Sequence, residues 1–211
     1  MSTVARDLRL PAKVLVELRD RELRYDVIDG QLSLEADPQH DAWLFALLDG
    51  LEVRHEVLDG LLFVTPPASP SHELAVAELF FQLRSQSPSG VRVFASNLGY
   101  YYDGDSYSLA DVTVVSGDAL DARGTSAPSL LVEVLSPSTR RNDLRLKREL
   151  YAEHGVPSYW VVDTEARSLA VLSLRGREYV ESARAVGSES LVLQEPFPVT
   201  IDATPLWLPT S

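Results

Sequence analysis

Residues 129–163 contain an apolar run, a proline, a helical pattern and a second apolar run, in that order. The first run, SLLVEVLS (129–136), shows no alternation of polar and apolar residues, which indicates a central strand covered on both faces. Pro137 ends this strand, and Gly155 ends the helix that follows it. SYWVVD (158–163) predicts a second strand. A strand, a helix and a strand in succession are typical of a mixed α/β sheet.

The strand at 129–136 and the helix that follows it each carry one charged residue within an apolar pattern. Glu133 stands between two valines, where a lone ionised carboxylate is costly unless it is paired, protonated or bound to a cation. At about 100° per residue, Lys147 falls on the apolar arc of the helix at 142–154. This arc also holds Leu144, Leu146, Leu150 and Tyr151, and Thr139 or Asn142 is placed to cap the helix. A buried Glu133–Lys147 ion pair is the simplest interpretation, and a lysine whose ammonium reaches the edge of the apolar face is the alternative.

A second carboxylate occupies the same kind of position. Asp111 lies between Ala110 and Val112 in SLADVTVVS (108–116), which we expect to form one strand. If this strand neighbours the one that holds Glu133, two carboxylates and one ammonium converge. Two carboxylates repel each other unless a proton or a divalent cation lies between them, so the set favours an oxygen-ligated Mg²⁺ or Mn²⁺.

Such a group of residues suits one reaction. A bound divalent cation polarises a phosphodiester and lowers the pKa of a bound water. A nearby lysine positions the nucleophile or stabilises developing negative charge. Asp111, Glu133 and Lys147 would all be used in phosphodiester hydrolysis.

Weaker candidates lie in other elements. His72 joins the site as an imidazole on the helix predicted to start at Ser69 and Pro70, although a packed histidine is the simpler interpretation. Glu56 in a predicted hairpin and Glu78 in a polar wedge of that helix carry too little signal for a role. The helix is otherwise apolar almost all round, which fits burial on several sides or a contact in a homodimer.

A cluster of basic residues interrupts an acidic chain. The net charge of -12 repels nucleic acid on average and attracts metal cations. Arg140, Arg141 and Arg145 nevertheless crowd together with Lys147 and Arg148. The cluster predicts a local contact with phosphate, and a solvated helix face explains it equally well.

Length and composition limit the remaining classes. A chain of 211 residues can form one substantial domain. It has no cysteine, which excludes disulfides, thiolate metal sites and a cysteine nucleophile. Because no apolar run reaches the roughly 18 residues of a membrane span and no signal segment is evident, we expect a soluble cytoplasmic protein that does not enter a membrane.

The order of predicted elements completes the organisation. RYDVIDGQLSLEADPQHD (24–41) parallels RHEVLDGLLFVTPPASPSHE (54–73), and each predicts two strands joined at Asp-Gly. A strand at 91–99 precedes the one at 108–116, with Asp103, Gly104 and Asp105 in the turn between them. From residue 69 the order is therefore α-β-β-β-α-β, followed by further strands and a proline-rich stretch.

Residues 50–200 resemble the Uma-type family of putative restriction endonucleases, within the PD-(D/E)XK nuclease superfamily. The matching pieces are RHEVLDG (54–60), PPASPSH (66–72), ADVTVV (110–115), LLVEVLSPSTRRND (130–143), Lys147 with LYAEHGVPSYWVVD (150–163), and EPFPVTID (195–202). The resemblance implies a restriction-endonuclease-like core with extra C-terminal strands in residues 50–211. It leaves residues 1–49 as an N-terminal extension of unknown role.

The resemblance also implies roles. Asp111 takes the place of the aspartate in the PD motif, with Ala110 instead of proline, and Glu133 that of the acidic residue in (D/E)XK. Leu135 stands where the lysine of that motif is usual, so the displaced Lys147 is expected to replace it. Leu61 stands where relatives usually have an acidic residue.

Together the residues and the resemblance predict an Mg²⁺- or Mn²⁺-dependent DNA endonuclease. Asp111 and Glu133 would ligate the metal, Lys147 would act near the attacking water, and His72 would support the site. Arg140, Arg141 and Arg145 of the basic cluster would meet phosphate. The alternative is a catalytically inactive nuclease-fold module that binds nucleic acid or assembles with other proteins, which the acidic net charge and Leu61 favour.

Overall fold

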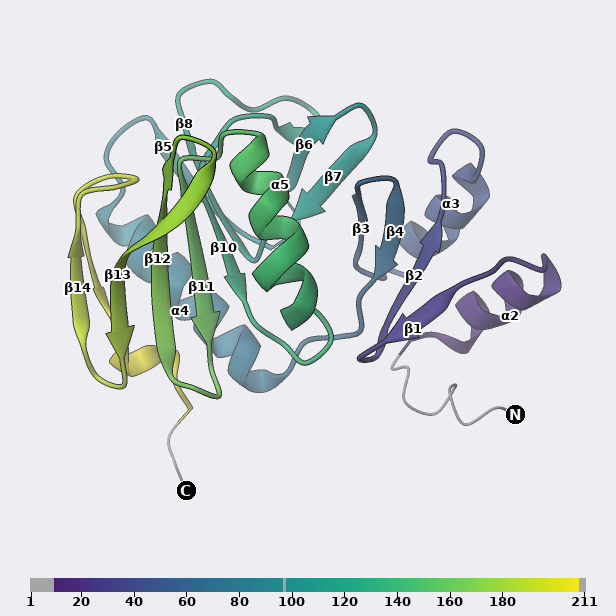
Figure 1. The fold of residues 1–211 in the computed structure, drawn as a ribbon, viewed down its shortest axis with the longest axis horizontal. Coiled ribbons are helices and arrows are strands. Elements are labelled where there is room, and N and C mark those ends of the chain that lie inside the picture. Colours follow the sequence, from purple (N-terminus) through teal and green to yellow (C-terminus); the bar gives the residue numbers. More distant parts are fainter. Residues whose placement is uncertain (1–9, 97, 209–211) are drawn as a thin grey trace.

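The structure is a computed structural model that describes residues 10–96 and 98–208. Over these residues the chain forms a six-stranded sheet, a seven-stranded sheet and a two-stranded sheet, with helices packed against them (Figure 1). The predicted mixed α/β class is confirmed.

The six-stranded sheet contains the predicted core. Its strands are β5 (Val91–Ala95), β8 (Val112–Ser116), β10 (Pro128–Val134), β11 (Ser158–Asp163), β12 (Ser168–Arg175) and β13 (Glu178–Val186). They lie in the order β13-β12-β11-β10-β8-β5, with β10 and β11 parallel and the other pairs antiparallel. β10, the continuous apolar run, is therefore central, as its composition predicts.

Helices cover both faces of this sheet, so β10 is buried on both sides (Figure 1). α4 (Pro70–Gln86) packs on one face beside β14 (Ser190–Leu193), β15 (Val199–Asp202) and the short helix η2 (Thr204–Leu206). Ser69 caps α4 by accepting a hydrogen bond from the His72 N–H at 3.3 Å, and Pro70 takes the first helical position, as expected. α4 does not bury its whole surface, because Phe81 is 66% exposed.

The opposite face is covered by a helix that differs from the expected regular one. Residues Asn142–Lys147 form a π-helical turn, η1, which continues into the α-helix α5 (Arg148–Glu153). The wider turn shifts the phase that 100° per residue assumes, so Asp143 is buried and Leu144, expected on the apolar arc, is 39% exposed. The predicted caps are also wrong, because Ser136 Oγ accepts from the Thr139 N–H at 3.2 Å.

The seven-stranded sheet contains β1 (Asp26–Ile28), β2 (Gln31–Glu35), β3 (His55–Leu58), β4 (Leu61–Val64), β6 (Gly99–Asp103), β7 (Ser106–Leu109) and β9 (Gly124–Thr125). Both halves of the near-repeat are two-residue hairpins, and β2 pairs with β4 so that they lie side by side. Asp59 (φ 51°) and Gly60 (φ 76°) have positive φ, as do Asp29 and Gly30 in the first hairpin.

The N-terminal segment packs against this sheet. α2 (Ala12–Asp20) and α3 (Ala42–Gly50) supply Leu18 and Leu48 to a hydrophobic cluster that also contains Val57 and Leu62 of the β3–β4 hairpin. Residues 12–50 therefore share a core with β3 and β4. A domain boundary at residue 50 stays a prediction.

The segment 108–116 is two strands in two sheets, and not the single strand expected. The N–H of Asp111 donates to the carbonyl of Val132 at 3.0 Å, so the chain joins the six-stranded sheet from Asp111 onward. Before this point, the Leu109 N–H donates to Glu56 Oε1 at 2.7 Å and its carbonyl accepts from Arg54. The side chains of Glu56 in β3 and of Arg54 just before it thus replace ladder partners at Leu109, and the chain changes sheets between β7 and β8. The turn at 103–105 joins β6 and β7. It does not join the two strands that were expected at 91–99 and 108–116.

A close approach of backbones between β6 and β9 generates a test of the fold. A Cβ on Gly124 would lie 2.9 Å from the carbonyl carbon of Gly99, so Gly124→Ala is expected to lower the free energy of unfolding by about 1–3 kcal/mol, as overpacking does. Gly50→Ala is the control, because nothing lies within 4 Å of its added methyl group; it is expected to be neutral or to stabilise by up to about 1 kcal/mol. Urea denaturation measures both, and equal effects would contradict the β6–β9 contact.

Candidate active site

A cleft of about 930 Å³ lies where the two large sheets meet, and charged side chains from both line it. Asp111, Glu133, Lys147 and His72, all predicted from the sequence, are among its lining residues. The structure therefore brings the four candidates together at one cavity. Their catalytic roles stay predictions.

Lys147 lies at the centre of a buried ionic cluster. Its Nζ is 3.0 Å from Glu133 Oε1, 2.8 Å from Glu56 Oε1 and 3.5 Å from Asp143 Oδ1. The Lys147 side chain is only 2% exposed. Burial disfavours the ammonium, but the charges of Glu133, Glu56 and Asp143 outweigh it and raise the pKa of Lys147 well above its ordinary value. Lys147 is therefore a permanent cation at neutral pH.

The predicted Glu133–Lys147 pair is thus part of a larger group. Tyr151 also donates its hydroxyl to Glu133 Oε1 at 2.9 Å. Burial, together with the neighbouring carboxylates, raises the pKa of Glu133 well above its ordinary value. Burial raises the pKa of Asp143 to about 6, and neither carboxylate oxygen has a hydrogen-bond partner among the described residues.

Asp111, which also lines the cleft, makes a separate set of contacts. Its Oδ1 is 3.1 Å from Arg54, and its Oδ2 accepts from the Val134 N–H at 2.8 Å and lies 3.1 Å from His72 Nε2. Burial alone would raise the pKa of Asp111, but the charge of Arg54 and the contact with His72 outweigh it and lower the pKa to about 2. Burial lowers the pKa of His72, whereas the hydrogen bond to Asp111 raises it, and the net direction is upward.

Two members of the site, Arg54 and Asp143, were missed from the sequence, and a third, Glu56, was considered but given no role. Glu56 and Arg54 alternate on one face of the chain entering β3, and this i, i+2 pattern of opposite charges was the available signal. Asp143 precedes Lys147 by one helical turn, where charges pair readily, but burial of the pair has no sequence signal of its own. Each contributes a charge that changes the balance of the site.

The charge balance tests whether a divalent cation suits the cleft. Among the described residues, four buried carboxylates, those of Glu56, Asp111, Glu133 and Asp143, face two permanent cations, Arg54 and Lys147. The excess negative charge requires protons or a further cation. Asp111 and Glu133 both line the open cleft and offer only oxygen, the ligand that Mg²⁺ and Mn²⁺ prefer. The donor chemistry fits, although no three acidic or histidine side chains in residues 10–96 and 98–208 already surround a common metal position.

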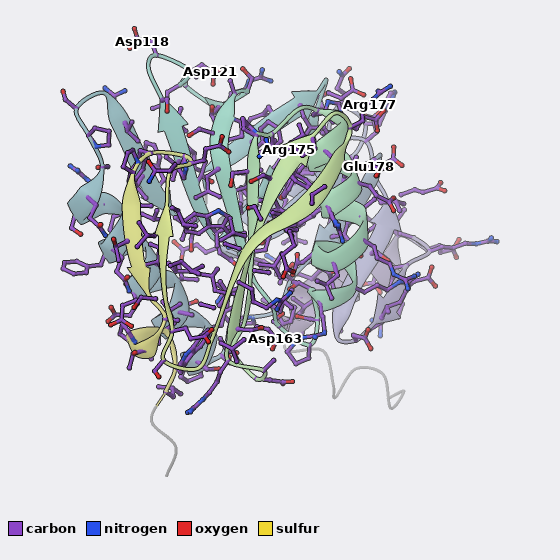
Figure 2. The ribbon with its side chains drawn as sticks, turned by 60° about the vertical axis from the view of Figure 1, so that its left-hand side comes forward. Asp118, Asp121, Asp163, Arg175, Arg177 and Glu178 are labelled. Atoms are coloured by element: carbon purple, nitrogen blue, oxygen red, sulfur yellow. The ribbon has the colours of Figure 1, made fainter. Side chains whose placement is uncertain are left out.

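The predicted arginine cluster does not line this cleft. Arg140 lies 2.8 Å from Asp163 at the end of β11, whereas Arg145 lines a second depression with Arg177. Figure 2 shows Asp163 and Arg177 at opposite ends of the sheet. Arg141 is exposed. A contact of Arg140, Arg141 and Arg145 with phosphate stays a prediction.

The departure at Leu61 does not alter the cleft. Leu61 is the first residue of β4, directly after the Asp59-Gly60 turn, and its side chain is exposed. It is not among the residues that line the cavity. The carboxylates around Lys147 are present whatever residue occupies position 61.

Fold and site together define a mixed α/β protein with a nuclease-like fold and an acidic, lysine-containing cleft. The sequence model of the Uma2 family, described as a putative restriction endonuclease, matches residues 37–206. The chain therefore belongs to the Uma2 family. The match begins in the N-terminal segment and covers every residue of the ionic cluster.

A solved structure supports the fold. The crystal structure of a putative nuclease belonging to DUF820 from Anabaena variabilis ATCC 29413 matches with a TM-score of 0.60 and 18% identity, covering 74% of this chain and 90% of that one. No curated protein matches the chain. Within the described part of the chain, no helix is both long and apolar enough to cross a membrane.

Removing the central cation tests the ionic cluster. Lys147→Met is expected to lower the free energy of unfolding by about 3–5 kcal/mol, because it leaves Glu56, Glu133 and Asp143 buried without their counter-charge. Urea denaturation at neutral pH measures the loss. Arg145→Met, an exposed site on the same helical turn, is the control and is expected to stay within about 0.5 kcal/mol of wild type.

The deficit of Lys147→Met should also depend on pH. Carboxyl groups with raised pKa bind protons more tightly in the folded protein than in the unfolded chain, so their contribution to stability falls as pH rises. The variant is therefore expected to be closer to wild type at about pH 5 than at neutral pH, because protonation relieves the unpaired charges. A deficit that is constant across this range would contradict the cluster.

Proposed function

We propose that this protein is a divalent-cation-dependent DNA endonuclease whose reaction takes place in the cleft between the two large sheets. The observation that carries the proposal is the convergence of Asp111 and Glu133, from neighbouring strands, with the buried ammonium of Lys147. Membership of a family described as putative restriction endonucleases supports the same reaction.

Asp111 and Glu133 are the residues that would hold Mg²⁺ or Mn²⁺. When bound, such a cation polarises a phosphoryl oxygen and makes a coordinated water more acidic. Glu133 is suited to this role because its contacts with Lys147 and Tyr151 both fall on Oε1, and no hydrogen bond among the described residues reaches Oε2. Holding both carboxylates on adjacent strands of one sheet fixes their spacing by backbone hydrogen bonds.

The protein's own residues assist the hydrolysis of one phosphodiester. The oxygen of a water forms the new bond to phosphorus and releases one proton to solvent, while the bond to the sugar oxygen breaks and that oxygen takes up a proton from solvent. Lys147 stabilises the negative charge that develops on phosphate oxygens; its raised pKa excludes a role as general base. His72 holds Asp111 through Nε2 and is thus a positioning residue.

A second candidate is a nuclease-fold module that binds or assembles without cleaving. The observation that favours it is the acidic lining of the cleft mouth, where Asp29, Glu52 and Glu73 add to the buried carboxylates. This lining would repel a polyanion in the absence of cations. Cation dependence of binding and of cleavage therefore separates the two candidates.

Calorimetric titration of Mg²⁺ and Mn²⁺, with a plasmid-nicking assay on the same samples, tests the proposal. The wild type is expected to bind saturably and to nick, and Glu133→Gln to lose at least about a hundredfold in nicking rate, since even outer-shell partners of a metal are worth 10- to 100-fold. Glu149→Gln, an exposed glutamate on α5, is the control and should behave as wild type. A folded wild type that neither binds nor nicks would leave the noncatalytic module as the function.

A further inference from the structure

Arg54 holds a position that the proposed reaction has not used. Its guanidinium lies 3.1 Å from Asp111 Oδ1 and also donates to the carbonyl of Leu109. The side chain is 25% exposed and lines the cleft. Burial lowers the pKa of Arg54, but the surrounding carboxylates, Asp111 foremost, outweigh this effect, so it stays charged.

Arg54 and a divalent cation would need the same oxygen. The other oxygen of Asp111 is already held by the Val134 N–H and by His72. A cation bound by Asp111 and Glu133 would therefore approach Oδ1, where the positive charge of Arg54 now lies. Two cations on one carboxylate oxygen repel each other, so occupancy by one weakens the other.

Arg54 is also the cation best placed to reach a substrate. Among the described residues that line the cleft, Arg54 and Lys147 are the lysine and arginine side chains. Lys147 is almost fully buried and surrounded by three carboxylates, whereas Arg54 is partly exposed and has a planar fork of donors that matches phosphate. A guanidinium released from Asp111 would meet a phosphate in the same cleft.

We propose that Arg54 has two alternating partners: Asp111 when no divalent cation is bound, and a phosphate of the nucleic acid once a cation has taken Asp111. Arg54 thereby stabilises the cation-free site and becomes a substrate-binding residue in the loaded one. The inference rests on the proposed function for its second partner. It also gives an otherwise acidic cleft a way to accept a polyanion only after a cation has bound.

The first test is the affinity for Mn²⁺, measured by calorimetry in wild type, Arg54→Met and the control Arg92→Met, an exposed arginine on β5 outside the cleft. Arg54→Met is expected to bind Mn²⁺ about tenfold more tightly, because the cation no longer has to displace Arg54 from Asp111. Two unit charges 3.1 Å apart, as in that pair, correspond to about this factor even in a water-like dielectric. Arg92→Met should match wild type. Unchanged or weaker binding by a folded Arg54→Met would overturn the proposal.

Stability provides a second readout, because the loss of a merely structural arginine would give a deficit that Mn²⁺ does not relieve. In EDTA, Arg54→Met leaves Asp111 with less counter-charge and should melt at a lower temperature than wild type. Saturating Mn²⁺ is expected to remove most of this difference, because the bound ion replaces the guanidinium and stabilises only the folded state. A deficit that Mn²⁺ leaves unchanged would contradict the exchange. If Arg54→Met does not fold, Arg54→Ala is compared in EDTA and Mn²⁺ by the same criterion, and failure of both variants to fold even with Mn²⁺ would overturn it.

The phosphate partner is tested with a short fluorescein-labelled DNA duplex in the Mn²⁺-loaded proteins. Arg54→Met should bind the duplex more weakly although it binds Mn²⁺ more tightly, and the slope of log affinity against log salt should fall by about 0.9 for one lost phosphate contact. Opposite effects on metal and duplex distinguish Arg54 from a residue whose loss simply damages the cleft. An unchanged salt slope would overturn the second partner.

The two levels of proposal can fail separately. A wild type that neither binds Mn²⁺ nor nicks plasmid removes the proposed function. A wild type that does both, beside an Arg54→Met variant with unchanged metal and duplex affinity, removes only the role of Arg54.

Discussion

The ammonium of Lys147 links three parts of this protein. It contacts Glu56 on β3, Glu133 on β10 and Asp143 on η1, so one buried charge joins the seven-stranded sheet, the six-stranded sheet and the helix that covers the latter. Buried ions are costly to desolvate, and they are tolerated here because every charge has a neighbour of opposite sign within 4.0 Å. The same arrangement leaves carboxylates in excess, and this excess makes the cleft suited to cations.

The sequence indicates the centre of the site because polar residues interrupt apolar patterns there. Asp111, Glu133 and Lys147 each stand where burial is expected, and burial forces charged groups to find partners. The central position of β10 and the caps at Ser69 and Gly155 follow from equally local signals. These features depend only on residues close together in the chain.

What could not be predicted depends on partners far apart in the sequence. The break between β7 and β8 arises because Glu56 and Arg54, more than fifty residues earlier, take the hydrogen bonds of Leu109. The π-helical turn at 142–147 has no distinctive composition, so the exposed Leu144 and the buried Asp143 could not be told apart. Propensity and periodicity describe a chain in isolation, and these contacts are made between sheets.

The crossover of the chain at Ala110 determines where the two large sheets would pivot. The chain leaves one large sheet at Leu109 and enters the other at Asp111, so the two sheets share a pivot beside the buried carboxylates. In a small rotation of one sheet against the other, displacement grows with distance from the pivot. The outer walls at Asp29 and Ser138, which also line the cavity, would then separate while Asp111 stays almost in place. Such leverage would widen the mouth of the cleft while leaving the atoms at its base in place.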